Sequence, residues 1–378
     1  MQGDAIRRMK SFRDGSRLLA GLMILALAGC DNVDWGGMDV AVIPPPPKGA
    51  AGEDEGGQAA EMGPLPDGPV LYYVRADSTG GTIQPVAEVS GDSLIALGAD
   101  ADPDLYGSRF ISQHLRRGSE FTLFRRGARV GTLLVGNAEV PRSAACRRLP
   151  IGRGTLELAG GTLAGPTEFL ALAKQNAPEG RSTAVSSEPT IGMRRVAPIL
   201  AERALRARRA QLPGNWQAAM AQLVPFPVSA TREPAFASTF LVDDQLQVGN
   251  DTTGYSMFLL AVPRSDLTGY DTVHVAYSAY PRTGKRAPRV VDYLDWDRDG
   301  EAELLLQVYG TSRAWFEAVG PDDGEWSGAF QERCTEEVPS AAPPPEPGDT
   351  AQTGTTSAMI LPARAAPGFP LSLGRPHA

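Results

Sequence analysis

Between residues 70 and 330 the chain is a succession of short segments with strand character, separated by turn residues. In several of them apolar and polar residues alternate, as they do in sheets with one face in solvent. The strand candidates are residues 70–74, 120–124, 130–135, 155–158, 257–262, 272–280, 289–294, 303–309, 313–319 and 326–330. Strands do not alternate with helices along the chain, so the sequence predicts a mainly β fold of antiparallel sheets. The sheets are expected to form a sandwich or a partly propeller-like arrangement.

One helical insertion interrupts the strands. Pro198 suits the first turn of a helix, and Gly214 suits the position after its end. The insertion is rich in arginine, with Arg194, Arg195, Arg203, Arg206, Arg208 and Arg209. These arginines form either a solvated helix face or a surface for anionic lipid headgroups.

Both ends of the chain have the composition of disordered segments. Residues 30–68 are rich in proline, glycine and acidic residues, and residues 337–378 contain further prolines, glycines and threonines. Such segments cannot bury enough apolar surface to fold. Between these ends we expect a β subdomain over residues 69–180 and a helix with a β-meander over residues 190–336.

The N-terminus combines a basic start with a short apolar run. Arg7, Arg8, Lys10, Arg13 and Arg17 precede the apolar residues 18–28, which end in the sequence Leu27-Ala28-Gly29-Cys30. This pattern resembles the signal peptide and lipobox of bacterial lipoproteins. The run is too short for a transmembrane helix, which needs about 20 apolar residues.

The resemblance implies removal of residues 1–29 and attachment of a diacylglycerol to Cys30. Met1 and Met9 are both candidate start sites. The protein is then expected in the bacterial cell envelope, on the extracytoplasmic side of a membrane.

Charge and cysteine content limit the remaining possibilities. The chain of 378 residues has a net charge of −8, which argues against nucleic-acid binding because that function needs a basic patch. With Cys30 lipidated, Cys146 and Cys334 remain. In an oxidising compartment we expect these two to form a disulfide, with two buried free thiols as the alternative.

The sharpest motif of the mature chain lies between two strand candidates. Asp295, Asp297 and Asp299 occupy positions 1, 3 and 5 of a loop, and Gly300 at position 6 allows a sharp turn. Glu301 would contribute its backbone carbonyl and Glu303 a further carboxylate. Oxygen ligands of this kind suit calcium, so the loop is a candidate calcium site; the alternative is an acidic surface turn.

The loop resembles the calcium loop of FG-GAP (integrin-propeller-like) repeats, in which the acidic residues lead directly into an apolar strand. It is not an EF-hand, because position 12 is Leu306 and the flanking segments are strands. The resemblance implies a structural calcium ion without a catalytic role. A second run, Asp100, Asp102 and Asp104, has the same spacing but lacks the glycine.

A second resemblance concerns hydrolysis. The sequences Gly91-Asp92-Ser93-Leu94 and Asp271-Thr272-Val273-His274 are similar to two blocks of GDSL (SGNH) esterases. This resemblance implies Ser93 as nucleophile, His274 as base and Asp271 as the residue that orients it. The asparagine block of that family is missing and the family is α/β.

We therefore expect a calcium-stabilised envelope lipoprotein with a binding or structural role, and an esterase as the alternative. The partner would be an envelope protein or a glycan. Trp315 and Trp326 could contact such a partner or belong to the core.

Overall fold

The computed structural model describes residues 62–332 except residues 145, 179–187, 229–232, 250–252, 267 and 323. The predicted signal peptide, Cys30, the first part of the spacer and the tail 337–378 lie outside the described residues. Antiparallel sheets dominate the described part, which confirms the mainly β fold class. None of its helices is long and apolar enough to span a membrane.

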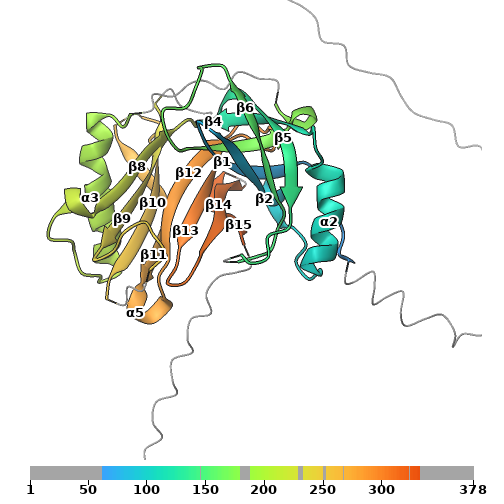
Figure 1. Ribbon diagram of the computed structural model, residues 1–378. Helices are drawn as coiled ribbons and strands as arrows, with labels where there is room; N and C mark the ends of the chain where they lie inside the picture. The colour runs from blue at the N-terminus through green and yellow to red at the C-terminus, as the bar shows by residue number, and fades with distance from the viewer. Residues whose placement is uncertain are drawn as a thin grey trace, which may run out of the picture. The chain divides into compact units, whose positions relative to one another are not determined.

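Six strands close into a barrel in which every strand is antiparallel to both neighbours (Figure 1). The ring order is β1-β7-β4-β5-β6-β2, and pairing between β1 and β2 closes it. A short strand, β3 (Ser93–Ala96), pairs antiparallel with the end of β2 and is not part of the ring. The ring strands are β1 (Val70–Asp77), β2 (Gly80–Ser90), β4 (Glu120–Arg125), β5 (Ala128–Glu139), β6 (Ile151–Leu158) and β7 (Thr167–Ala173).

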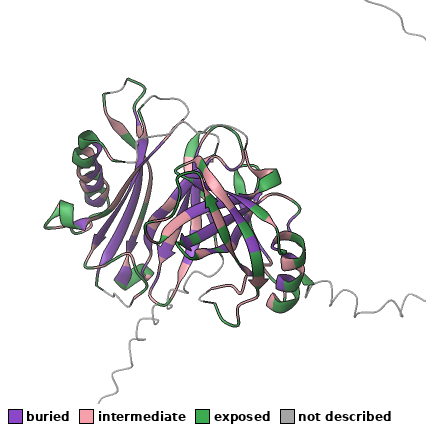
Figure 2. Cartoon of the chain, turned by 45° about the horizontal axis from the view of Figure 1, so that its top comes forward, coloured by how far each residue is buried: buried purple, intermediate pink, exposed green. Residues whose placement is uncertain are grey.

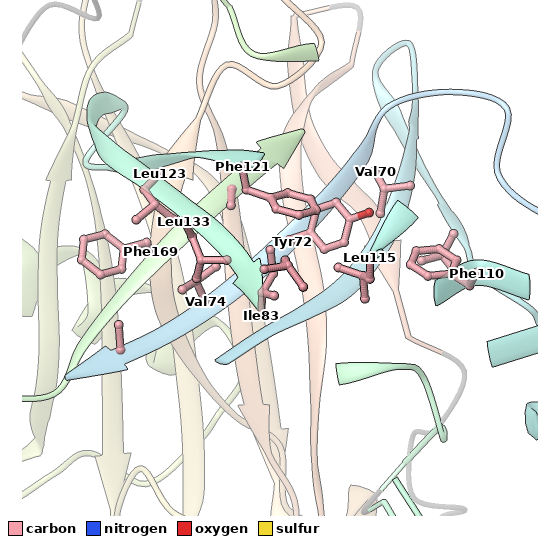
Figure 3. Close-up of a cluster of buried hydrophobic side chains, with 14 of the residues drawn as sticks. Val70, Tyr72, Val74, Ile83, Phe110, Leu115, Phe121, Leu123, Leu133 and Phe169 are labelled. Carbon is pink, nitrogen blue, oxygen red and sulfur yellow. The ribbon is translucent and has the colours of Figure 1, made fainter. Parts of the chain in front are cut away.

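Alternate residues of the barrel strands fill its interior (Figure 3). Tyr72 and Phe121 meet edge to face there, with ring centroids 4.8 Å apart. Helix α2 (Pro103–His114) contributes Phe110. Its side chain lies next to Leu115 at one end of the buried cluster drawn in Figure 3. Sequence reasoning did not predict this helix, which adds buried aromatic side chains to the barrel core.

Two four-stranded antiparallel sheets follow the barrel in the chain. In the first sheet the order is β11-β10-β9-β8, and in the second it is β12-β13-β14-β15. The two sheets bury a common apolar cluster that includes Phe258, Leu304 and Trp315. The strands are β8 (Met220–Phe226), β9 (Ala235–Val242), β10 (Tyr255–Pro263), β11 (Tyr270–Ala279), β12 (Ala287–Leu294), β13 (Glu303–Tyr309), β14 (Ala314–Asp322) and β15 (Glu325–Gln331).

The second sheet is covered on both faces. Leu304 and Leu306 of β13 face the first sheet, whereas Leu305 packs with barrel residues such as Leu172. Side chains of β1 also alternate between the two faces of the strand: Tyr72 points into the barrel and Tyr73 toward the second sheet. Burial on both faces explains why β1 and β13 contain continuous apolar runs. Figure 2 shows that buried residues are concentrated in the strands.

Helix α3 (Ile191–Ala207) covers the other face of the first sheet, and its buried residues pack on β9 and β10. The expected helix boundaries were wrong at both ends. The helix begins after Thr190, whose hydroxyl accepts the N–H of Met193, so Pro198 lies inside it. It ends at Ala207, well before Gly214.

The arginines of α3 lie on its solvent side, and Arg206 forms an ion pair with Glu202 one turn away. Three single-turn helices complete the described structure: η1 (Lys174–Asn176), α4 (Trp216–Ala219) and α5 (Tyr280–Thr283). The barrel strands fall within residues 69–180, and α3 with the two sheets falls within residues 190–336.

Candidate metal centre

The acidic loop predicted from the sequence joins β12 to β13 and is held by its own hydrogen bonds. Asp297 Oδ1 accepts the N–H of Asp299 at 3.1 Å, and Asp299 Oδ1 accepts the N–H of Glu301 at 2.7 Å. Gly300 has a φ of 95°, a conformation that favours glycine. Trp296, only 2% exposed, anchors the loop in the cluster between the barrel and the second sheet.

Carboxylates converge at this loop in two overlapping groups. Oxygens of Asp295, Asp297 and Glu303 lie within 4.8 Å of one another, and so do oxygens of Asp92, Asp297 and Asp299. Because Asp297 belongs to both groups, the five side chains form one carboxylate cluster. Oxygens that share a calcium ion at 2.3–2.6 Å lie at separations of this size.

Glu303 is the buried member of the carboxylate cluster. It opens β13, is 2% exposed, and its Oε2 accepts the N–H of Trp296 at 3.1 Å. Gly320 of β14 leaves space for the Glu303 side chain, since a Cβ at position 320 would lie 3.0 Å from Glu303 Cγ. Burial and then the charge of Asp297 raise the pKa of Glu303 to about 9.

The other carboxyls show the same effect of crowding. Burial raises the pKa of Asp297 to about 6, and the charge of Asp299 acts in the same direction. Burial also raises the pKa of Asp295. A cation among these groups would offset the repulsion that opposes their ionisation.

The donor set fits calcium. Asp295 Oδ1 is buried and has no hydrogen-bond partner among the described residues, so it has lone pairs available for a ligand. Both groups consist of carboxylates alone, without a histidine or cysteine. Hard oxygen donors of this kind favour calcium or magnesium over zinc or copper.

Asp92 is the residue that sequence reasoning missed. It lies in the tight turn between β2 and β3, next to Gly91 with a φ of 55°. The barrel hairpin brings it to a loop some two hundred positions later in the chain. The only sequence signal was its place in the esterase-like block, which assigned it no role in metal binding.

The second acidic run does not form a metal loop. Asp102 is the N-cap of α2, and its Oδ1 accepts the N–H groups of Asp104 and Leu105 at 3.0 and 2.9 Å. The spacing therefore marks the start of a helix. Pro103, the first helical residue, was the signal that could have shown it.

The structure does not bring the esterase residues together as a triad. Asp271 forms an ion pair with Arg264 at 2.8 Å, and His274 forms a hydrogen bond with the backbone of Trp326. Ser93 is exposed at the start of β3. Among the described contacts, none links two of the three residues.

The remaining predicted residues have varied outcomes. Cys146 is disulfide-bonded, but Cys334 lies outside the described residues, so their pairing stays a prediction. Trp315 is 2% exposed and belongs to the core between the sheets, against which Trp326 packs. Trp315 is therefore closed to a glycan, whereas Trp326 is half-buried.

Comparison of the chain with family models, curated proteins and solved structures finds no match. The function is therefore argued from the chain's own residues.

Proposed function

We propose that this protein is a bacterial envelope lipoprotein, anchored to the membrane through Cys30, with a calcium-stabilised β module that has a binding or structural role. The calcium ion would join the β12–β13 loop to the β2–β3 turn. Its role is to hold the fold rather than to catalyse a reaction.

The observation that carries the proposal is the convergence of five carboxylates from two distant loops. Without a cation, such a cluster opposes the contact between the barrel and the second sheet. With a divalent cation, the same contact becomes a cross-link between them. The buried, unpartnered Asp295 Oδ1 supports the same interpretation.

A thermal melt of the full chain in detergent micelles tests the calcium site. Calcium at 10 mM, compared with EGTA, is expected to raise Tm by several degrees. An affinity typical of extracellular modules, 10⁻⁴–10⁻³ M, corresponds to about 1–3 kcal/mol at this concentration. The Asp297→Ala variant should lose the shift, because Asp297 belongs to both carboxylate groups.

Magnesium serves as a second cation in the same melt. Calcium tolerates an irregular, carboxylate-rich site better than magnesium does, so its shift should be larger. Equal Tm values in calcium and EGTA for the unmodified chain would reject the metal site.

The anchor is tested separately in a bacterial expression host. Metabolic labelling with a palmitate analogue should label the unmodified chain and not the Cys30→Ala variant. Equal labelling of both chains would reject lipidation at Cys30.

A further inference from the structure

A cavity of about 430 Å³ lies where the barrel, β8 and β12 meet. Its lining includes Arg75 on β1 and Arg125 and Arg126 at the β4–β5 hairpin, all three of them exposed to solvent. The volume is in the range of small-ligand sites. The carboxylate cluster described above shares none of its lining residues with this cavity.

The acidic side chains of the cavity accept hydrogen bonds from other partners. Glu168 accepts two hydrogen bonds from Arg289, at 2.6 and 2.9 Å, and one from Tyr73. Asp292 accepts the backbone N–H groups of Arg126 and Tyr293, at 2.8–2.9 Å. Neither carboxylate makes a hydrogen bond with the guanidinium groups of the three cavity arginines, although the charge of Arg75 acts on Glu168 and the charges of Arg125 and Arg126 act on Asp292.

The other polar lining side chains are also satisfied. Gln222 bridges both main-chain groups of Val290, at 2.9 and 2.8 Å, and Thr167 donates to the carbonyl of Gly165. The guanidinium groups of Arg75, Arg125 and Arg126, by contrast, make no hydrogen bond or ion pair within the described part of the chain. Each offers five N–H donors.

The hairpin that carries two of these arginines is fixed in place. Arg126 and Gly127 both have positive φ, 54° and 69°, as in the tight turns that normally contain asparagine and glycine. An arginine in this conformation is strained, and such strain is concentrated at functional sites. The bidentate contact of Asp292 with the Arg126 N–H, and a bond of 3.0 Å from Gly127 N to Tyr293 O, hold the turn against β12.

A bulge in β12 makes this contact possible. The register shifts between Val290 and Asp292, so Val291 and Asp292 both lie toward the barrel while Val290 faces the first sheet. Bulges re-aim side chains in this way and are common beside functional sites. The fold thus positions the hairpin that carries Arg125 and Arg126 through the buried carboxylate of Asp292, which accepts backbone N–H groups rather than a guanidinium.

We infer that this cavity is a binding site for an anionic ligand with a phosphate group. Three planar guanidinium forks with unused donors suit the several oxygens and the charge of a phosphate ester. The phosphate belongs either to a small soluble ester or to the headgroup of an anionic lipid. The inference deepens the binding role proposed above, and the site does not depend on calcium.

Calorimetric titration of the full chain in detergent micelles tests the site with two probes. Glycerol 3-phosphate represents the soluble ester, and dihexanoyl phosphatidylglycerol, below its micelle concentration, represents the headgroup. At least one probe should bind, and binding should weaken as salt is raised, because the contacts are ionic. The tighter probe identifies the source.

The decisive variant combines Arg75→Gln, Arg125→Gln and Arg126→Asn, where asparagine retains the positive φ. It should weaken binding at least tenfold. The matched control, Arg194→Gln with Arg195→Gln and Arg203→Gln, removes the same charge from the exposed face of α3 and should change affinity less than twofold. The double variant Arg75→Gln/Arg125→Gln leaves the turn intact and should also weaken binding if the triple variant fails to fold.

Three results would overturn the inference: neither probe binds at millimolar concentration, the cavity variants bind like the unmodified chain, or the α3 control loses as much affinity. Titrations in calcium and in EGTA separate this test from the calcium site. A calcium-dependent Tm without phosphate binding would reject only the anionic site, and phosphate binding without a calcium effect would reject only the metal.

Discussion

At the scale of single residues, Asp92 links two regions that the sequence keeps far apart. Its carboxylate joins Asp297 and Asp299 across the gap between the β2–β3 turn and the β12–β13 loop. Asp92 is exposed, whereas Glu303 is buried. We therefore expect Asp92 to be a peripheral ligand and Asp297 a central one.

The variant Asp92→Asn should reduce the calcium-induced rise in Tm without abolishing it, because one of five carboxylates is lost. Asp322→Asn, an exposed aspartate in a different hairpin, should leave the rise unchanged. The measurement is the Tm difference between 10 mM calcium and EGTA for each variant. A full-sized rise in Asp92→Asn would place Asp92 outside the metal site.

Two histidines should make the folded state sensitive to acid. Burial lowers the pKa of His114, whose ring packs on Phe110, and burial also lowers that of His274. The unfolded chain therefore takes up these protons first as the pH falls below about 6.5, the usual histidine value. The contribution of the two histidines to stability should therefore decrease as the pH falls from 7 to 5, whereas buried carboxyls with a raised pKa, such as Glu303 and Asp297, act in the opposite direction.

The double variant His114→Gln/His274→Gln isolates this effect. Its free energy of unfolding is measured in urea at several pH values. Relative to the unmodified chain, this free energy should become larger as the pH falls from 7 to 5, because the variant lacks the destabilising histidine contribution. Carboxyl groups titrate alike in both proteins, so the difference reports the histidines. Equal slopes would show that burial does not perturb them.

At the scale of elements, α2 shows how one residue decides between two interpretations of a sequence pattern. Asp102 caps the helix with two hydrogen bonds, so Asp102→Ala should lower stability by about 1 kcal/mol. Asp102→Ser should retain most of the stability of the unmodified chain, since serine is also a good N-cap. Urea denaturation of the three proteins measures both changes.

The same variants test the discarded metal interpretation of the Asp100–Asp104 run. The calcium-induced rise in Tm should be equal in Asp102→Ala and in the unmodified chain. A reduced rise would return this run to the list of calcium ligands.

At the scale of the whole described molecule, one apolar cluster joins the barrel to the second sheet. Leu172 of β7 is fully buried in it, together with Phe316 of β14. The ion pair between Arg289 and Glu168 spans the same boundary. These contacts predict that the barrel and the sheets unfold together.

The variant Leu172→Ala should lower the free energy of unfolding by about 2–5 kcal/mol, because it leaves a cavity in this cluster. Leu134→Ala removes the same atoms from a side chain that is 46% exposed. It should change the free energy of unfolding by less than about 0.5 kcal/mol. Far-UV circular dichroism reports all strands, whereas tryptophan fluorescence reports the sheets, since residues 69–180 contain no tryptophan.

The two signals should give the same urea midpoint in every variant. A shift of the circular dichroism transition alone in Leu172→Ala would show that the barrel unfolds as a separate unit.

Local pattern was sufficient for much of the fold. Residues 303–309 were predicted as a strand and coincide with β13, and the predicted strands 120–124 and 130–135 lie within β4 and β5. Pattern failed where burial removes the alternation, as in β9, which is buried over almost its whole length. It also failed at Pro198, because a proline suited to a first turn lies inside α3.

By itself, therefore, the sequence determined which segments extend, where tight turns occur and that Asp295, Asp297 and Asp299 share one loop, since each depends on neighbouring residues. Only the tertiary structure decided that β1 closes a barrel on β2, that Asp92 meets this loop and that Arg75 faces the same cavity as Arg126. These are contacts between distant positions, and they arise from packing two faces of a sheet at once. The periodicity of a single segment shows that a face is apolar, but not which surface will cover it.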